Sequence, residues 1–295
     1  SIQQSENQKQ KSWNDNVNAN DLGLKDVKWY DPAYEPADWL TMNVHGYWDN
    51  EGLKTNGVVW YRKEIDLPQS VAGKPAKLFL GRIIDADFTY VNGKQVGNIT
   101  YQYPPRRYVI PEGVLKAGKN IITVRIINSN GQGGLAIDKP YYLQVGKDSI
   151  DLKGSWQYKL GYSSAPMKTG GINILYQPSG IYNSMIAPLI NYTIRGANWY
   201  QGEGNAGNPG GYHVQLSAMI KDWRKKWGQG NFPFQIVQLP NYGEAPKQPG
   251  ESNWAELREQ QLKTLNQPNT ALVVTIDIGE WHDLHPPNKQ DVGER

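Results

Sequence analysis

Residues 87–97 read DFTYVNGKQVG, and this stretch decides the fold of the first half of the chain. An Asn-Gly pair between two short apolar runs is a strong signal for a two-residue hairpin, because a type I′ turn needs a positive φ at both central positions. Similar runs separated by turn residues follow one another, with no convincing helix between them: GVVWYRKEIDL (57–67), AKLFLGRI (76–83), NIITVRIIN (120–128) and YYLQVG (141–146). The pattern predicts an antiparallel β-sandwich over about residues 28–150.

The pattern changes from about residue 172 onward. Apolar residues at helical spacing predict one amphipathic helix over 211–227, stopped by Gly228, and a second over 253–266 with Asn253 as N-cap. Three short apolar runs are compatible with buried parallel strands: 194–200, 234–239 and 271–276. Alternating strands and helices indicate an α/β fold for this half.

Composition narrows the function classes. The net charge of +3 on 295 residues, with no basic run, gives no argument for nucleic-acid binding. The absence of cysteine excludes disulfides and thiolate catalysis, and only four histidines are present. We therefore expect no metal site and no cofactor. No stretch approaches the ~20 apolar residues of a membrane span.

Polar residues follow two of the predicted strands. Asp283 and His285 come just after the run 271–276, and the first strand of this half runs into WYQGEGNAGN (199–208). Open α/β sheets present catalytic groups outside the carboxyl ends of their strands. Glycines there allow close approach of the backbone to a ligand, and free N–H groups can stabilise an oxyanion. The glycine-rich segment alone is equally typical of an ordinary strand-to-helix loop.

An ordered series of motifs resembles a known family. The series is PSGIYNSMIAPLI (178–190), GANWYQGEGNA (196–206), MIKDWRKKWGQGNFPFQIVQL (219–239), WAELREQQ (254–261) and DIGEWHDLHPPNKQDVG (277–293). It resembles the carboxyl-terminal half of the sialate O-acetylesterases, members of the SGNH hydrolase superfamily. The segments GVVWYRKEIDLP and IDADFTYVNGKQVG resemble the galactose-binding-like sandwich of glycoside hydrolases, which commonly interrupts the esterase domain in this family.

The resemblance implies a fold of α/β plus all-β class. We expect part of a three-layer, flavodoxin-like SGNH parallel-sheet domain with an inserted jelly-roll β-sandwich. On this interpretation residues 1–27 are a linker or a remnant of the first part of the esterase domain. Residues 28–160 form the sandwich, and residues 170–295 form the carboxyl-terminal half of the esterase domain. We expect both ends of the chain to be cut from a longer protein.

The resemblance also implies site residues. His285 corresponds to the family's catalytic histidine, and Asp283 is the first choice for the acid that orients its imidazole. In many SGNH enzymes this acid lies three residues before the histidine, where this chain has His282. Asp277, Glu280 or a dyad without an acid therefore stay open. Four residues match the family's QGE segment and should line the oxyanion and substrate side: Gln201, Gly202, Glu203 and Asn205.

The family's nucleophile lies in a Gly-Gln-Ser-Asn segment ahead of the sandwich, and this chain begins after that point. One similar stretch, Gly250-Glu251-Ser252-Asn253, directly precedes a predicted helix. Ser252 is better explained as part of a helix cap, because Ser and Asn are preferred there. Ser179 is interpreted as structural or substrate-lining. We expect the nucleophilic serine on a missing amino-terminal segment, a complementary partner that would complete the site.

The expected function is removal of O-acetyl groups from sialic acid or related acetylated sugars by serine-ester hydrolysis, in a secreted or periplasmic protein. An alternative is a non-catalytic carbohydrate-binding protein that uses the sandwich, with exposed Trp29, Trp39, Trp48 or Tyr101 stacking on sugar. A third possibility, a fragment of a glycoside hydrolase, needs two carboxylates on a barrel domain. The chain beyond the sandwich has neither the length nor the repeated units for a barrel.

Overall fold

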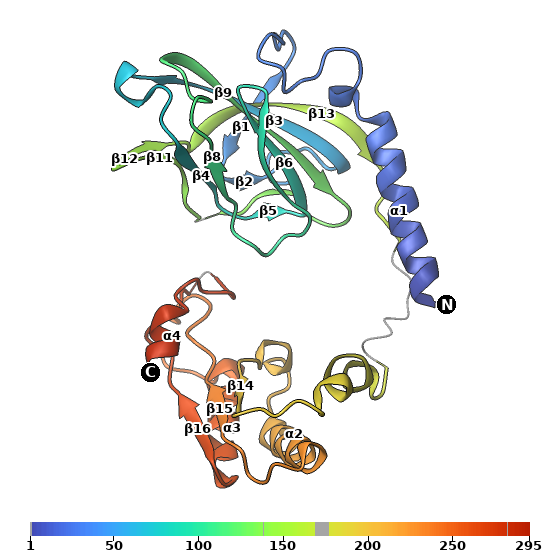
Figure 1. Ribbon diagram of the computed structural model, residues 1–295, viewed down its shortest axis with the longest axis vertical. Helices are drawn as coiled ribbons and strands as arrows, with labels where there is room; N and C mark the ends of the chain where they lie inside the picture. The colour runs from blue at the N-terminus through green and yellow to red at the C-terminus, as the bar shows by residue number, and fades with distance from the viewer. Residues whose placement is uncertain (1, 138, 169–176, 282) are drawn as a thin grey trace. The chain divides into compact units, whose positions relative to one another are not determined.

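The computed structural model describes residues 2–137, 139–168, 177–281 and 283–295 (Figure 1). The chain divides into two compact units, Ser1–Ile172 and Asn173–Arg295. No helix within the described ranges combines the length and the apolar character that a bilayer crossing requires. Each unit is considered by itself below.

The first unit is a β-sandwich with one helix. Helix α1 covers Ile2–Asn20. The strands are Leu40–Val44 (β1), Gly46–Tyr47 (β2), Asn56–Leu67 (β3), Ala76–Leu80 (β4), Ile83–Ile84 (β5), Ala86–Val91 (β6), Lys94–Ile99 (β7), Arg107–Ile110 (β8), Gly118–Asn128 (β9), Gly134–Leu135 (β10), Tyr141–Val145 (β11), Asp148–Asp151 (β12) and Gly154–Ser164 (β13). They form sheets in the orders β1-β13-β3-β9-β6-β7, β12-β11-β4-β8 and β2-β10-β5. Every pairing described in this unit is antiparallel, as predicted.

The hairpin signal at residues 92–93 is confirmed. Asn92 and Gly93 join β6 to β7 with φ angles of +48° and +81°. Both residues adopt the left-handed conformation that this turn requires. Because the turn sets the register, side chains of β6 alternate between the sandwich core and the outer face of the six-stranded sheet.

Aromatic residues fill the core and one outer face of the sandwich. The core between the two larger sheets contains Trp48, Tyr61, Tyr141 and Trp156, all at most 1% exposed. Trp29 and Trp39 are 6% and 8% exposed and pack in a second cluster with Trp60 and Tyr90. The expectation that Trp29, Trp39 and Trp48 could stack on sugar is therefore wrong, because packing removes their rings from solvent. Tyr101 is 56% exposed.

Helix α1 was not predicted from its polar sequence. It contacts β13 and places Val17 in the aromatic cluster (Figure 1). Just beyond it, the buried carboxylate of Asp21 accepts hydrogen bonds from Trp60 Nε1 at 2.9 Å and from Arg125 Nε at 2.6 Å. These two bonds fasten the amino-terminal segment to β3 and β9.

The second unit alternates strands and helices. Its strands are Ala197–Trp199 (β14), Phe234–Val237 (β15) and Thr270–Val273 (β16), and its helices are Tyr212–Trp227 (α2), Asn253–Lys263 (α3) and Gln290–Glu294 (α4). The strands are parallel in the order β14-β15-β16, as predicted, although each is shorter than the apolar run that suggested it. Leu216 and Ile220 of α2 and Leu257 of α3 pack on Phe234 and Ile236 of β15.

The helix boundaries follow local signals. Helix α2 ends at Gly228, which has a left-handed φ of +65° and serves as the C-cap. Helix α3 begins one residue after Ser252, whose side chain accepts the backbone N–H of Ala255 at 3.3 Å. Ser252 is therefore the N-cap, and the assignment of Asn253 to that position is wrong by one residue. The Ser252 hydroxyl satisfies an amide that the first helical turn leaves without a partner.

Candidate active site

The segment 201–205 follows β14 at its carboxyl end. Gln201 Nε2 donates to Asn205 Oδ1 at 3.0 Å, which closes the loop on itself. The Glu203 carboxylate accepts the backbone N–H of Gly202 at 2.9 Å, so that N–H is occupied within the loop. The bond to Gln201 uses the oxygen of the Asn205 amide. The loop thus gathers three polar side chains in a few residues of chain.

Two residues from the helices hold this loop in place. The buried Gln261 side chain donates to the carbonyl of Gln201 at 3.1 Å and to that of Val237 at 3.4 Å, and it accepts the N–H of Leu239 at 2.9 Å. The Tyr212 hydroxyl lies 2.9 Å from both the main-chain and the side-chain oxygens of Gln201. Burial raises the pKa of this phenol. Residues of α2 and α3 therefore fix the position of Gln201 relative to the end of β15.

The loop after β16 carries Asp283 and His285. Asp283 is buried, and its Oδ1 accepts the backbone N–H of His285 at 2.8 Å. The backbone of Asp283 bridges to Glu280, with its N–H donating to the Glu280 carbonyl at 3.0 Å. The His285 side chain is exposed. His282 lies outside the described residues.

This loop rests on the segment that follows β15. A side chain at Gly279 would come within 2.5 Å of both Pro240 and Asn241, so only glycine permits this approach. The N–H of Gly243 donates to the carbonyl of Trp281 at 2.6 Å. The loop that carries Asp283 is therefore supported by the end of the neighbouring strand.

Lys289 connects the two loops. Its ammonium lies 4.5 Å from the centre of the Tyr200 ring, next to the loop at 201–205. Burial lowers the pKa of Lys289, while the carboxylates of Glu203 and Asp283 act to raise it. Burial and the Glu203 carboxylate likewise raise the pKa of the Tyr200 phenol. The ammonium of Lys289 therefore lies in the electrostatic field of Glu203 from the first loop and of Asp283 from the second.

The alternative acids have other contacts. Asp277 makes a two-pronged ion pair with Arg295, at 2.6 and 2.7 Å. Hydrogen bonding to this guanidinium lowers the pKa of Asp277 to about 2. Glu280 contributes its backbone to the bridge with Asp283. The assignment of Asp283 as the orienting acid stays a prediction.

Neither Ser252 nor Ser179 was predicted to be the nucleophile: Ser252 was expected to cap a helix, and Ser179 to be structural or substrate-lining. The Ser252 hydroxyl caps helix α3, as described above. Ser179 adopts a left-handed φ of +60° in an exposed turn before the helical segment 182–186.

Three contributors were not singled out as site residues from the sequence, namely Tyr212, Gln261 and Lys289. Gln261 and Lys289 lie within motifs of the series described above, and Tyr212 lies in the helix predicted over 211–227. Tyr212 and Gln261 fall in the two helices that were predicted from apolar spacing alone. The direction in which their polar atoms point depends on the packing of α2 and α3.

Two family models match separate parts of the chain, one in the parallel α/β unit and one in the β-sandwich. Residues 165–292 match the family "carbohydrate esterase, sialic acid-specific acetylesterase". Residues 25–132 match the "beta-galactosidase second all-beta domain". The chain thus combines a region similar to a carbohydrate esterase with a region similar to a β-galactosidase-type sandwich.

The carboxyl-terminal part of the chain, residues 165–292, is similar to the sialate O-acetylesterases. The sialate O-acetylesterases of Homo sapiens and Mus musculus are 32% and 34% identical to it over 135 residues, which is 40% of this chain and 25% of each relative. A putative beta-glucuronidase of Formosa agariphila is 31% identical over 123 residues, 39% of this chain and 15% of that protein. The chain thus matches about a quarter of the length of the curated esterases.

The similar solved structures have lower sequence identity to the chain than the curated relatives do. A carbohydrate acetylesterase from Xanthomonas citri has a TM-score of 0.37 and 20% identity, covering 77% of this chain and 72% of that one. A beta-glucuronidase from Bifidobacterium dentium has a TM-score of 0.30 and 27% identity, covering 35% of this chain and 17% of that one. TM-scores this low carry no argument about function.

Proposed function

We propose that the protein is a carbohydrate esterase that removes O-acetyl groups from sialic acid or a related acetylated sugar. The observation that carries the proposal is the contact of the Lys289 ammonium with the Tyr200 ring, which brings the segment after β16 against the end of β14. This links the two loops whose sequences match the esterase family. We further propose that the protein is secreted or periplasmic, because the enzyme would encounter acetylated glycans there.

In this proposal His285 is the general base. It removes the proton from a serine hydroxyl, which attacks the acetyl carbonyl, and later returns that proton to the leaving alkoxide of the sugar. Asp283 holds the histidine loop through its bond to the His285 backbone. The amide side chains of Gln201 and Asn205 face the carbonyl oxygen as it becomes negatively charged. Preorganised donors of this kind lower the barrier because they need no reorientation during the reaction.

The nucleophilic serine is proposed to lie on an amino-terminal segment outside the printed sequence. The capping bond of Ser252 supports this, since a hydroxyl that caps a helix is poorly placed to act as nucleophile. The parallel order β14-β15-β16 supports a larger SGNH-type three-layer domain that the further segment would complete. Without the nucleophile, only the residual rate from binding and oxyanion stabilisation would remain.

Acetate release from 9-O-acetyl-N-acetylneuraminic acid and from acetylated xylan tests the proposal. The assay compares this chain alone with a chain extended by the upstream coding sequence, each with His285 or His285→Ala. We expect hydrolysis only by the extended chain with His285, and a loss of at least ~10³-fold in kcat on substitution. His213→Ala, which changes a histidine on helix α2, is the matched control.

A fluorophosphonate probe locates the nucleophile in the same samples. Labelling of the added segment supports the proposed assignment. Labelling of Ser252 in the chain alone would show that the serine assignment is wrong. An extended chain that releases no acetate from either substrate, or that keeps full activity with His285→Ala, would refute the esterase proposal.

A further inference from the structure

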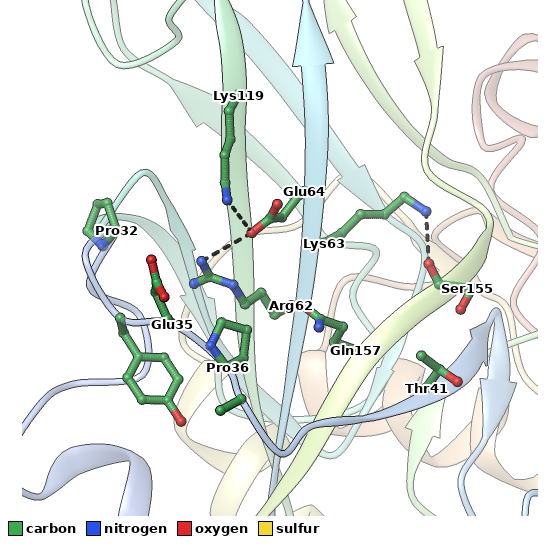
Figure 2. A pocket seen from close by; sticks show the side chains of 12 residues that line it. Pro32, Glu35, Pro36, Thr41, Arg62, Lys63, Glu64, Lys119, Ser155 and Gln157 are labelled. Carbon is green, nitrogen blue, oxygen red and sulfur yellow. Dashed lines mark hydrogen bonds and ion pairs between the residues drawn. The ribbon is translucent and has the colours of Figure 1, made fainter.

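A pocket of about 590 Å³ opens on the outer face of the six-stranded sheet (Figure 2). Its floor is formed by residues of β1, β13, β3 and β9, and the segment 32–37 lines one side. All of its lining residues belong to the sandwich unit. The candidate esterase residues contribute nothing to it.

Arg62 lies at the floor of this pocket and is almost completely buried. Its side chain is 1% exposed, and Nε and Nη1 have no hydrogen-bond partner within the described part of the chain. Its one recorded ion pair joins Nη2 to Glu64 Oε1 at 3.5 Å, and Glu64 is 41% exposed. Lys119 Nζ binds the same oxygen at 2.8 Å (Figure 2). The buried guanidinium is therefore only weakly compensated by the protein.

A buried guanidinium with so few partners lowers the stability of the fold unless a ligand or water supplies the missing hydrogen-bond acceptors. A buried charge without hydrogen-bonded partners destabilises a fold strongly, because desolvation is not repaid by new contacts. The strand itself dictates the position, because β3 alternates: Val59 and Tyr61 enter the core, and Trp60 and Arg62 face outward. The sequence thus places a forked donor at this point of the outer face.

Arg62 belongs to a row of polar residues that crosses four strands. Thr41 of β1 pairs with Gln157 of β13, Gln157 pairs with Arg62, and Arg62 pairs with Thr123 of β9. Residues paired directly across strands lie on the same face of the sheet. Thr123 Oγ1 is also buried and has no recorded hydrogen-bond partner in the described chain. Hydroxyl, amide and guanidinium groups therefore adjoin one another.

The lining suits a sugar acid. A guanidinium matches the two oxygens of a carboxylate, with two parallel hydrogen bonds. The Thr41 hydroxyl and the Gln157 amide can bond to sugar hydroxyls. Glu64 and Lys119 are 41% and 63% exposed, so they can move aside and admit the carboxylate.

We propose that this pocket of the sandwich binds the carboxylate of an acidic sugar, with Arg62 as the carboxylate anchor. The site is non-catalytic, and its existence does not depend on the esterase proposal. It would hold an acidic glycan on the same chain as the esterase loops.

Isothermal titration calorimetry of the full chain tests this proposal with N-acetylneuraminic acid, galacturonic acid, the methyl ester of galacturonic acid, and acetate. We expect at least one sugar acid to bind with a Kd of about 1 mM or tighter. The neutral methyl ester should bind at least ~10-fold more weakly, because it cannot form the charge-assisted pair. The two acids distinguish a sialic-type from a uronic-type ligand.

Gln157→Glu is the decisive variant. It places a carboxylate beside Arg62 in register and leaves the guanidinium itself in place. We expect the melting temperature to rise and the sugar-acid affinity to fall at least ~10-fold, because the new side chain occupies the donors. Gln95→Glu, on exposed β7 of the same sheet, adds the same charge away from the pocket and should change neither.

Binding that Gln157→Glu leaves unchanged would overturn the proposal, even if binding were tight, because it would belong to another part of the chain. Absence of binding by both acids at 10 mM, a concentration about tenfold above the expected Kd, would also overturn it. In that case Arg62 is satisfied by buried water alone. Equal affinity for acetate and the sugar acids would reduce the pocket to a simple anion site and refute the sugar component.

Discussion

Replacing Gln261 by methionine should loosen the loop at residues 201–205 without disturbing helix α3. Methionine has a similar volume and a similar helix propensity, but it can neither donate nor accept the three bonds described above. The substitution leaves the buried N–H of Leu239 without an acceptor and removes a donor from the carbonyls of Gln201 and Val237.

The cost can be worked out from these contacts. An unsatisfied buried N–H costs about 1–3 kcal/mol, and the loss of the donor to Gln201 about 1 kcal/mol more. The 3.4 Å contact with Val237 is too long to add much. The sum is about 2–4 kcal/mol. This corresponds to an opening equilibrium constant for this region that is at least ~25-fold larger.

Native-state hydrogen exchange measures this opening at the amides of Gly202 and Leu239, and urea unfolding gives the global change. Gln215→Met is the control, since Gln215 is exposed on α2, and it should change stability by no more than ~0.5 kcal/mol. If Gln261→Met and Gln215→Met gave the same exchange rates, Gln261 would not be what holds the loop to β15.

Two further predictions concern the ion pairs Asp21–Arg125 and Asp277–Arg295. Asp21→Ala should destabilise the sandwich by about 3–5 kcal/mol, because it leaves Arg125 buried without its counter-charge. An unchanged melting temperature would contradict this, and Asp21→Asn should lie between, since it keeps an acceptor for Trp60. Arg295→Ala should raise the pKa of Asp277 from about 2 toward the usual ~3.9. Because Asp277 has a depressed pKa when folded, its stabilising contribution is present above pH ~4 and is lost as the pH falls toward 2. NMR titration of the Asp277 carboxyl in both proteins checks this, and an unshifted pKa would exclude the ion pair as its cause.

Local signals account for what the sequence predicted correctly. The turn at Asn92-Gly93 needs only two residues to specify its geometry, and Gly228 ends α2 by its own conformation. The parallel strands were recognisable as short apolar runs because both their faces are covered in part. Their lengths were overestimated, since apolar residues such as Val274 and Ile276 continue beyond the last strand pairing.

Contacts between distant residues account for what was not predicted. Helix α1 is almost entirely polar and is held by Val17 and by the Asp21–Arg125 pair, whose partners are 104 positions apart. The same reason applies to the candidate site. Gln261 reaches Gln201 across 60 positions, so its role depends on how α3 packs on β15 and cannot be read from helix periodicity.

The position of β13 has a consequence for synthesis of the protein. This strand lies between β1 and β3, and Val44 of β1 pairs with Gly154 of β13, 110 positions later. A ribosome needs roughly 5–20 s to make that length of chain. During this interval both neighbours present unpaired backbone groups, and a direct β1–β3 pairing would be the nearest alternative. Because β1 and β3 each pair antiparallel with β13, they run parallel in the finished sheet, and a premature pairing between them must open before β13 can enter.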